Sequence, residues 1–211
     1  EFGDQFHKTA SIDEIQVDKD NTVKGNRENK EVLPVALLVS GADYKHTESL
    51  LPASNRGYSQ KFWDKKVMAP SSLLFYVGFD KKLKNVLHHT LFFDVSFDEH
   101  AKAIYDDPSW PDEPLFYASF PSITDSDVAP SGKEAAIFLI PLATDLEDND
   151  KLRENYFKII IERMERLSGQ ELSSSVLFKE SYCVNVFKND YNSFKGNAYG
   201  MAITLLQTAL L

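Results

Sequence analysis

Four short apolar segments, each bounded by turn-forming residues, do most to limit what this chain can fold into. They cover residues 73–79, 91–95, 115–120 and 135–143. The first two are apolar on both faces, whereas a strand with one solvated face alternates apolar and polar residues. Such a strand packs between two layers, or has a core on one face and a ligand on the other. We therefore expect a sheet with both of its faces occupied.

Helices are predicted between and after these strands. Over 151–168 apolar residues recur at helical spacing, and Gly169 ends the run. Ser96 followed by Glu99 forms a capping box, so a helix should start there and reach about residue 105. Helical character returns over 184–191. The sum is a mixed or antiparallel sheet with a few helices, an α+β arrangement.

The N-terminal part of the chain predicts a smaller set of strands. Segments 7–17 and 22–27 are β-prone and separated by polar turns, and 32–39 is almost wholly apolar, as in a strand buried on both faces. That third segment ends in Ser40-Gly41-Ala42-Asp43, where small residues permit a ligand or another backbone to come close. The alternative is an ordinary turn into a helix capped by Asp43.

Composition excludes several classes of function. Net charge is −9, from 23 Lys and Arg against 32 Asp and Glu, which argues against nucleic-acid binding because phosphates need a basic footprint. The single cysteine, Cys183, excludes an internal disulfide and a multi-cysteine zinc site, and is typical of a reducing, cytoplasmic compartment. No apolar stretch reaches the roughly 18–20 residues of a membrane-spanning helix.

The polar residues predict no metal site and no catalytic group. His88 and His89 are adjacent on a predicted strand, so we expect them on opposite faces, and His100 is expected in solvent. We interpret Asp125 and Asp127 as residues that cap turns in a loop, with a role in general acid–base catalysis as the alternative. For the Gly-x-x-x-Gly at 196–200 we expect close helix packing rather than a membrane dimer.

Four motifs taken in order along the chain carry a resemblance. They are Val39-Ser40-Gly41-Ala42-Asp43, Pro70-Ser71-Ser72-Leu73-Leu74-Phe75, the loop from Pro121 to Gly132, and Gly196-x-x-x-Gly200 leading to Leu205-Leu206-Gln207. The loop fits the pattern Pro-Ser-x-Thr-Asp-x-x-x-Ala-Pro-x-Gly throughout. Together they resemble the phytoene desaturase, or carotenoid dehydrogenase, family of FAD-dependent flavoproteins, within the amine-oxidase-like superfamily.

The resemblance implies a domain plan. Residues 1–60 would be a partial β-meander of a Rossmann-like FAD-binding domain, 61–195 a substrate-binding domain with helices on one face of its sheet, and 196–211 the return toward the flavin domain. Ile12, Gly41 and Ala42 would contact FAD. A long isoprenoid or carotenoid chain would contact five aromatic residues, for each of which a plain core role is the alternative: Phe75, Phe93, Tyr117, Phe120 and Phe138.

The chain also departs from the family. It contains no Gly-x-Gly-x-x-Gly, the turn that brings a pyrophosphate to a helix N-terminus, and it lacks the family's glycine-rich C-terminal motif. Both ends look severed, so we interpret the chain as an internal segment that does not hold FAD by itself and gives a colourless preparation.

The whole protein would desaturate a polyene, and an insoluble substrate leaves peripheral contact with the inner face of the cell membrane open. Alternatives are a carotenoid isomerase, a retinol saturase, or an isoprenoid- or lipid-binding module without catalysis.

Overall fold

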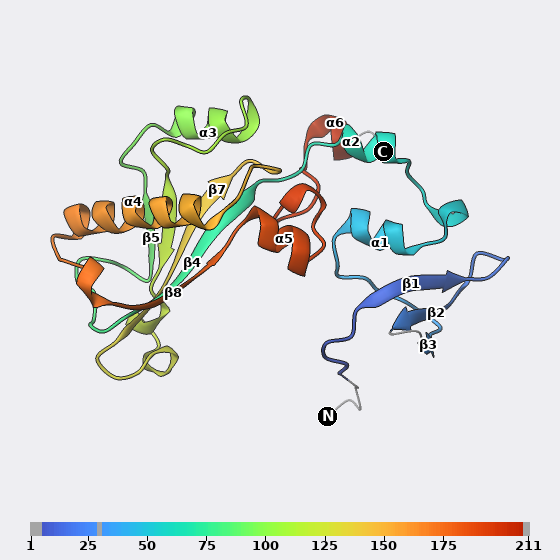
Figure 1. Cartoon of the computed structure of the whole chain (residues 1–211), viewed down its shortest axis with the longest axis horizontal. Coiled ribbons are helices and arrows are strands. Elements are labelled where there is room, and N and C mark those ends of the chain that lie inside the picture. Colours follow the sequence, from blue (N-terminus) through green and yellow to red (C-terminus); the bar gives the residue numbers. More distant parts are fainter. Residues whose placement is uncertain (1–5, 29–30, 209–211) are drawn as a thin grey trace.

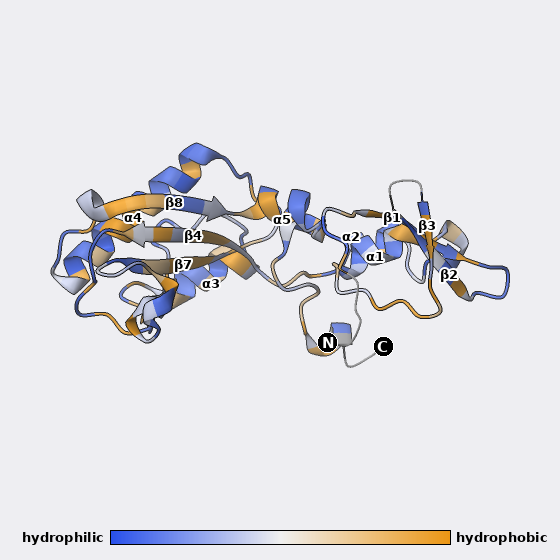
Figure 2. Ribbon diagram, turned by 90° about the horizontal axis from the view of Figure 1, so that it is seen from below, coloured by the Kyte–Doolittle hydropathy of each residue, from blue (hydrophilic) through white to orange (hydrophobic). Residues whose placement is uncertain are grey.

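The computed structural model describes residues 6–28 and 31–208, and these form two lobes joined by a narrow waist (Figure 1). The larger lobe holds a five-stranded sheet and the long helix α4 (Asp150–Ser168). The smaller lobe holds a three-stranded sheet and short helices. Helix α5 (Val184–Asp190) lies between the two lobes in both ribbon views (Figures 1 and 2).

The large sheet is antiparallel, in the order β5-β6-β7-β4-β8. Its strands are β4 (Ser71–Phe79), β5 (His89–Phe92), β6 (Phe116–Ser119), β7 (Glu134–Leu142) and β8 (Val176–Tyr182). The long strands β4 and β7 pair along their whole length and form the centre. All four strands expected from the apolar segments are therefore confirmed. The edge strand β8 was not predicted, because Lys179, Glu180 and Ser181 interrupt its apolar pattern.

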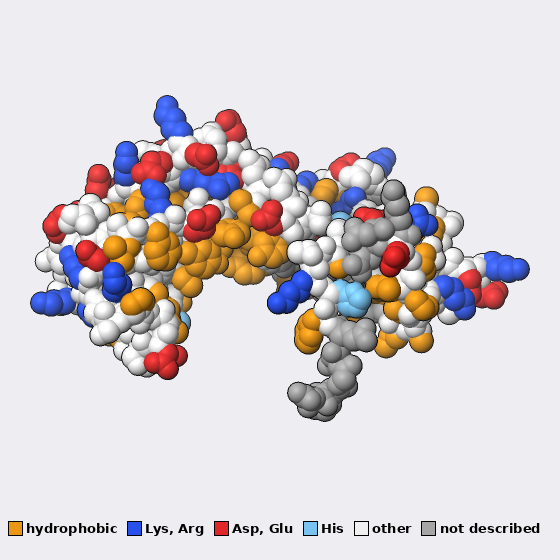
Figure 3. Space-filling view, turned by 60° about the horizontal axis from the view of Figure 1, so that its bottom comes forward, with side chains coloured by type: hydrophobic (Ala, Val, Ile, Leu, Met, Phe, Trp, Pro, Cys, Tyr) orange, Lys and Arg blue, Asp and Glu red, His pale blue; other side chains and the backbone are white. Residues whose placement is uncertain are grey.

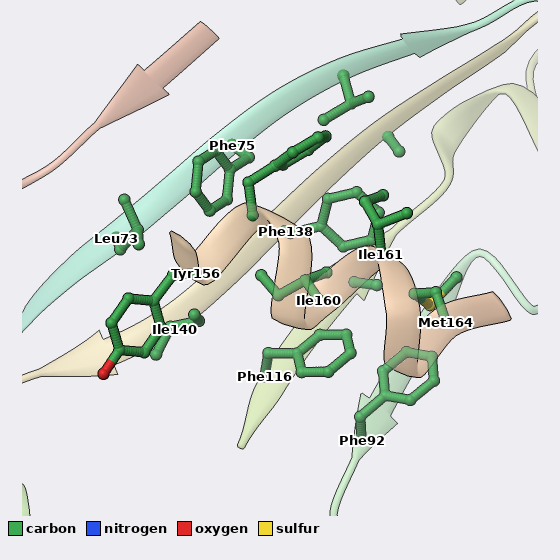
Figure 4. Packing of buried hydrophobic residues seen from close by; sticks show 14 of the residues in the cluster. Leu73, Phe75, Phe92, Phe116, Phe138, Ile140, Tyr156, Ile160, Ile161 and Met164 are labelled. Atoms are coloured by element: carbon green, nitrogen blue, oxygen red, sulfur yellow. The ribbon is translucent and has the colours of Figure 1, made fainter. Parts of the chain in front are cut away.

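Helix α4 covers one face of this sheet. Asn149 caps its start by accepting a hydrogen bond from the Leu152 N–H at 3.0 Å, and Gly169 ends it at a φ of 69°, which glycine adopts without strain. The helix is confirmed to within one residue. Its apolar stripe packs onto the phenylalanines of β4, β6 and β7 (Figure 4). This contact is the main hydrophobic core of the chain.

Helix α3 (Phe97–Tyr105) lies at one end of the sheet, beside β5 and β6. Ser96 caps it by accepting a hydrogen bond from the Glu99 N–H, so the predicted helix start is confirmed. Asp125 likewise caps a short turn by accepting from the Asp127 N–H at 2.9 Å, as the cap interpretation predicted. Within residues 6–28 and 31–208 there are also five single turns of 3₁₀-helix: Ala53–Asn55, Pro121–Ile123, Ser126–Val128, Ser173–Ser175 and Phe194–Gly196.

The small lobe is an antiparallel meander with helices packed beside it. Its strands are β1 (Ile12–Val17), β2 (Val23–Glu28) and β3 (Glu31–Pro34), and its helices are α1 (Tyr44–Leu50), α2 (Gln60–Asp64) and α6 (Leu205–Thr208). The predicted meander is confirmed. Trp63 is the centre of the helical part: it is buried, and its indole N–H donates to the Glu48 carboxylate at 3.1 Å.

The strand predicted over 32–39 is wrong beyond Pro34. Leu37 and Val39 are 80% and 86% exposed instead of buried. Pairing with β2 ends one residue later, with a bond from the Val35 N–H to the Lys24 carbonyl, because β2 itself begins at Val23 and offers no further partner residues. Among the described residues, no further strand lies beside the segment to cover it.

Two chain crossings form the waist, and they are hydrogen-bonded to each other. The Ala69 N–H donates to the Gly200 carbonyl at 2.9 Å and the Ala198 N–H to the Pro70 carbonyl at 3.0 Å. The Gln207 side chain extends the pairing, because its amide accepts from the Val67 N–H at 2.8 Å and donates to the Val67 carbonyl at 3.0 Å. The two crossings therefore hold each other in place.

The helix packing expected of Gly196 and Gly200 is wrong. Both lie in turns, at φ values of 66° and 85°, and neither belongs to an α-helix. Gly196 does mark a close approach, because a Cβ there would lie 2.7 Å from the carbonyl oxygen of Val184. The division of the chain at residues 60 and 195 stays a prediction.

Candidate functional site: an open apolar sheet face

The two faces of the large sheet differ in what covers them. Along β7, residues alternate strictly between buried and half-buried, and the buried set faces α4. The other set points away from α4, to the face that no described helix covers across the middle of the sheet. Apart from Glu134 at the start of the strand both sets are apolar, so the sheet presents an uncovered hydrophobic floor. We call this surface the open face.

The pairing register identifies the open face. Leu74 lies opposite Leu139 and Tyr182, and Tyr76 lies opposite Ile137. The same alternation adds the apolar residues Leu91, Tyr117 and Phe178, and it also places the Glu180 carboxylate on this face, opposite Tyr76. Figure 3 shows hydrophobic side chains gathered on the large lobe where it faces the small lobe.

Gly78 lets an aromatic ring lie directly on the sheet. A Cβ at this position would lie 2.3 Å from the Phe178 ring, so the ring rests where a side chain would stand. The Tyr76 and Tyr182 rings meet edge to face at 5.7 Å. These aromatic contacts make the floor broad rather than ridged.

The structure separates the five aromatic residues predicted to contact substrate. Phe75, Phe120 and Phe138 are at most 1% exposed and belong to the core cluster on the α4 side. Figure 4 shows Phe75 and Phe138 in this cluster. Phe93 and Tyr117 instead line a common apolar hollow of about 220 Å³ between α3 and the sheet. Tyr117 also belongs to the open face. Substrate contact by these five residues stays a prediction.

A polar chain runs along the rim of the open face. The Tyr117 hydroxyl and His89 Nδ1 are 2.6 Å apart, and His88 Nδ1 is 2.6 Å from the Thr124 hydroxyl. The expectation that the two histidines lie on opposite faces is wrong, since their ring centroids are 4.2 Å apart. His88 precedes β5 rather than lying in it, so strand alternation does not separate the pair. The described residues contain no group of three potential metal ligands.

His100 was expected in solvent and is buried. Its Nδ1 accepts from the Leu115 N–H at 2.8 Å, so the other nitrogen carries the proton and donates to the Pro141 carbonyl at 2.8 Å. Burial lowers the pKa of His100, and the nearby Arg163 guanidinium lowers it further, although the bond to Pro141 opposes both. The imidazole is therefore neutral, and its two hydrogen bonds join α3 to the sheet.

A second hollow, of about 720 Å³, brings together the three residues predicted to contact FAD. Ile12, Gly41 and Ala42 all line it. Ile12 lies on β1, which pairs only with β2 among the described strands, so one backbone edge of β1 carries no partner strand. Nothing lies within 4 Å of a Cβ placed on Gly41. Asp43 meanwhile caps α1 by accepting from the His46 N–H, as the alternative interpretation predicted.

A buried ion pair fixes the end of the large lobe nearest the waist. Both Asp148 carboxylate oxygens accept from Arg153, at 2.7 and 2.6 Å, and one also accepts from the Asn185 N–H at 2.9 Å. Burial alone would raise the pKa of Asp148, but these bonds outweigh it and lower the pKa. Burial beside Asp148 raises the pKa of the Cys183 thiol to about 12. This cluster is structural, because it ties the start of α4 to α5.

The fold resembles part of one solved structure. The chain superposes on an oxidoreductase from Methanosarcina mazei with a TM-score of 0.55 at 16% identity, over 82% of this chain and 37% of that one. At this identity the likeness concerns the fold alone. No protein-family model matches the chain.

Sequence comparison is more specific. The chain is 35% identical over its whole length to the carotenoid 3,4-desaturase of Haloarcula japonica, of which it covers 43%. It is 27% identical, over 98% of its length, to the zeta-carotene-forming phytoene desaturase of Myxococcus xanthus, of which it covers 40%. The chain is thus a homologue of the carotenoid and phytoene desaturases. It spans about two fifths of the length of these relatives.

Sequence reasoning missed the open face itself. Tyr76 is not among the five residues predicted to contact substrate, and β8, which supplies Phe178 and Tyr182, was not predicted. In β4 every residue from Leu73 to Phe79 is apolar, aromatic or glycine, so hydropathy alone does not distinguish its two faces. No helix among the described residues is both long and apolar enough to cross a membrane.

Proposed function

We propose that this chain supplies the substrate-contacting sheet of an FAD-dependent carotenoid desaturase. The observation that carries the proposal is the open face: a wide apolar floor left uncovered in a chain whose relatives are desaturases of carotenoids. Burying apolar area is favourable by about 25 cal/mol per Å², so such a floor is costly to leave in water. A long hydrocarbon bound on the floor removes that cost, because it shields the apolar side chains from water.

The dimensions of the floor suit an extended ligand. Five strands at a spacing of about 4.8 Å make a floor roughly 19 Å wide from β5 to β8. We propose that the polyene lies across the strands, in contact with Tyr117, Leu139 and Tyr76. Phe93 would contact it at the α3 end. Phe75, Phe120 and Phe138 would support the floor from the α4 side without touching the ligand.

The small-lobe hollow fits part of a flavin cofactor. The unpaired backbone edge of β1 at Ile12 offers N–H and C=O groups to the adenine end, and the open space beside Gly41 and Ala42 admits a close approach of the ribityl chain. When bound, FAD would accept the hydride removed from the polyene. The 211 residues contain no Gly-x-Gly-x-x-Gly, so we expect FAD to be held mainly by residues outside this chain.

The residues of this chain would then act by position and by exclusion of water. The polar groups of the described floor lie at its two edges: Tyr117 and His89 on the β5 side, and Glu180, which lies opposite Tyr76, on the edge strand β8. An insoluble polyene has to reach the floor from a lipid phase, so the proposal includes peripheral contact of a cytoplasmic protein with a membrane. The acidic net charge of −9 means that such contact would depend on apolar rather than electrostatic attraction.

The proposal is tested at two levels. The first is binding: the purified chain is mixed with phosphatidylcholine vesicles that carry phytoene, and transfer of phytoene to the protein fraction is measured. Tyr76→Glu adds a second carboxylate beside Glu180, on the central strand β4 of the floor, and should abolish transfer. Tyr199→Glu makes the same change at an exposed site outside the large sheet and should leave transfer intact. Equal transfer by both variants, or none by the unaltered chain, would refute the proposed contact.

The second level is the reaction. A protein that carries this segment together with a flavin domain is expressed in cells that accumulate phytoene, and the pigments are separated by chromatography. New double bonds support a desaturase, whereas altered cis/trans geometry at constant mass supports a carotenoid isomerase, and loss of a double bond from retinol supports a retinol saturase. Binding without any product indicates a lipid-binding module.

A further inference from the structure

The α3 hollow is a separate compartment at one end of the open face. Its walls come from α3 on one side and from β5, β6 and the segment after β5 on the other. Apolar side chains dominate the lining, chiefly Leu91, Phe93, Phe97, Ala101, Ile104 and Tyr117. The polar group of the buried His100 in the wall is already satisfied by Leu115 and Pro141. The hollow therefore favours a ligand that needs no hydrogen bond.

The volume of the hollow limits the ligand to a small group. A dry apolar cavity of about 150 Å³ is large enough to bind benzene. The α3 hollow has about 220 Å³, which leaves room for a ring or a short branched chain but not for a whole carotenoid. Only one end of a long ligand fits.

The hollow and the floor share residues. Leu91 and Tyr117 lie opposite each other on β5 and β6, and each contributes to both surfaces. His89 holds the Tyr117 hydroxyl at 2.6 Å, and the two rings stack at 5.9 Å, so the ring that forms the common wall is fixed in position. A ligand lying across the floor toward β5 therefore reaches the mouth of the hollow.

We infer that the α3 hollow receives the terminal isoprenoid group of the polyene that lies on the open face. The inference rests on the proposed function. One end of the substrate is bound under α3, and this bound end, which we call the end stop, fixes which carbons of the substrate lie over each part of the open face. Ala101 is the smallest side chain of the lining and governs the depth of the hollow. Tyr117 is a positioning residue at its mouth.

The test uses a probe that is short enough to report the hollow alone. The chain is labelled with ¹³C at alanine and isoleucine methyl groups and titrated with geraniol, a C10 isoprenoid alcohol. We expect saturable shifts at the Ala101 and Ile104 methyl signals. Decan-1-ol has the same number of carbons and the same terminal hydroxyl but lacks the methyl branches and the double bonds. We expect it to bind about tenfold more weakly, the lower end of the discrimination that one carbon gives in an apolar pocket.

Matched variants on one helix provide the control. Ala101→Trp fills the hollow and should abolish the shift of Ile104, whereas Ala103→Trp points into a different, polar hollow lined by Asp107 and Glu113 and should leave it intact. Ile104→Ala enlarges the hollow and keeps the inference testable if the tryptophan variant does not fold, which circular dichroism decides. Geraniol should bind to the enlarged hollow with changed affinity.

The outcomes separate this inference from the proposed function. Loss of geraniol binding in Ala101→Trp, with phytoene transfer weakened by an equal or smaller factor, supports the end stop. Phytoene transfer without any geraniol shift at Ala101 and Ile104 overturns the end stop and leaves the floor. Geraniol binding without phytoene transfer overturns both, because the hollow would then serve a small ligand. Equal affinity for decan-1-ol overturns the assignment to an isoprenoid.

Discussion

Because His100 is neutral in the folded chain, the free energy of unfolding should decrease as pH falls through the range in which the unfolded histidine takes up a proton. In the folded chain both ring nitrogens are used, one as acceptor from Leu115 and one as donor to Pro141, so adding a proton breaks the first bond. The folded pKa is therefore below the ordinary value of 6.5. The unfolded chain takes up the proton near 6.5 while the folded chain does not.

The magnitude follows from linkage. Where only the unfolded state binds the extra proton, the free energy of unfolding changes by about 1.36 kcal/mol per pH unit, and it rises with pH. The contribution of His100 is thus fully present above pH 6.5 and is lost as pH falls toward the folded pKa. Between pH 7.5 and 5.5 the loss is at most about 1.4 kcal/mol.

Urea unfolding at pH 7.5, 6.5 and 5.5 measures this loss, with His100→Gln as the control that cannot titrate. The other groups with shifted pKa values lie outside this window, because the affected Asp and Glu carboxyls are lowered from values of 3.8 and 4.5 and Tyr156 and Cys183 are raised to about 12. The unaltered chain should lose more stability than His100→Gln over this range. An identical pH dependence in the two proteins would show that His100 is not held neutral.

Three further predictions concern single sites. Asp148→Ala leaves the Arg153 guanidinium buried without its partner and should cost about 3–5 kcal/mol in urea unfolding. Gly196→Ala should cost more than Gly132→Ala, since both have positive φ but only Gly196 would bring a Cβ within 2.7 Å of a carbonyl oxygen; equal losses would contradict the contact. Cys183 should resist iodoacetamide at pH 8 in the folded chain and react in urea, as its pKa of about 12 and its burial require.

Local signals in the sequence predicted the elements that have a local cause. The helix start at Ser96, the stop at Gly169 and the apolar stripe of α4 each depend on residues within a few positions of one another, and all three are confirmed. The strand expected over 32–39 failed for the opposite reason. Its apolar residues would need a neighbouring strand to cover them, and the described part of the chain does not supply one.

The histidines show the same limit at single residues. His100 looked like a solvated residue of a short helix, because nothing nearby in sequence shows that the Pro141 carbonyl and the Leu115 N–H converge on its two nitrogens. His88 and His89 were separated by a strand rule that applies only inside a strand, and the strand begins at His89. In each case the deciding partner comes from a distant segment or from an element boundary.

The open face could have been found by distinguishing tyrosine from phenylalanine. On β4 and β6 a phenylalanine precedes a tyrosine, and in both pairs the phenylalanine faces α4 and the tyrosine faces away: Phe75 with Tyr76, and Phe116 with Tyr117. A buried tyrosine hydroxyl needs a partner, whereas on an uncovered face it reaches water or a rim group such as His89.

Tyr156 is an example of the buried case: its side chain lies in the core, and its hydroxyl donates to the Pro111 carbonyl at 2.6 Å. In a strand whose residues are all apolar, a Phe-Tyr pair therefore indicates which face is packed and which is left for a ligand. This physical difference, rather than hydropathy, selects Tyr76 and Tyr117 over Phe75 and Phe138 as the residues to change in a search for the substrate.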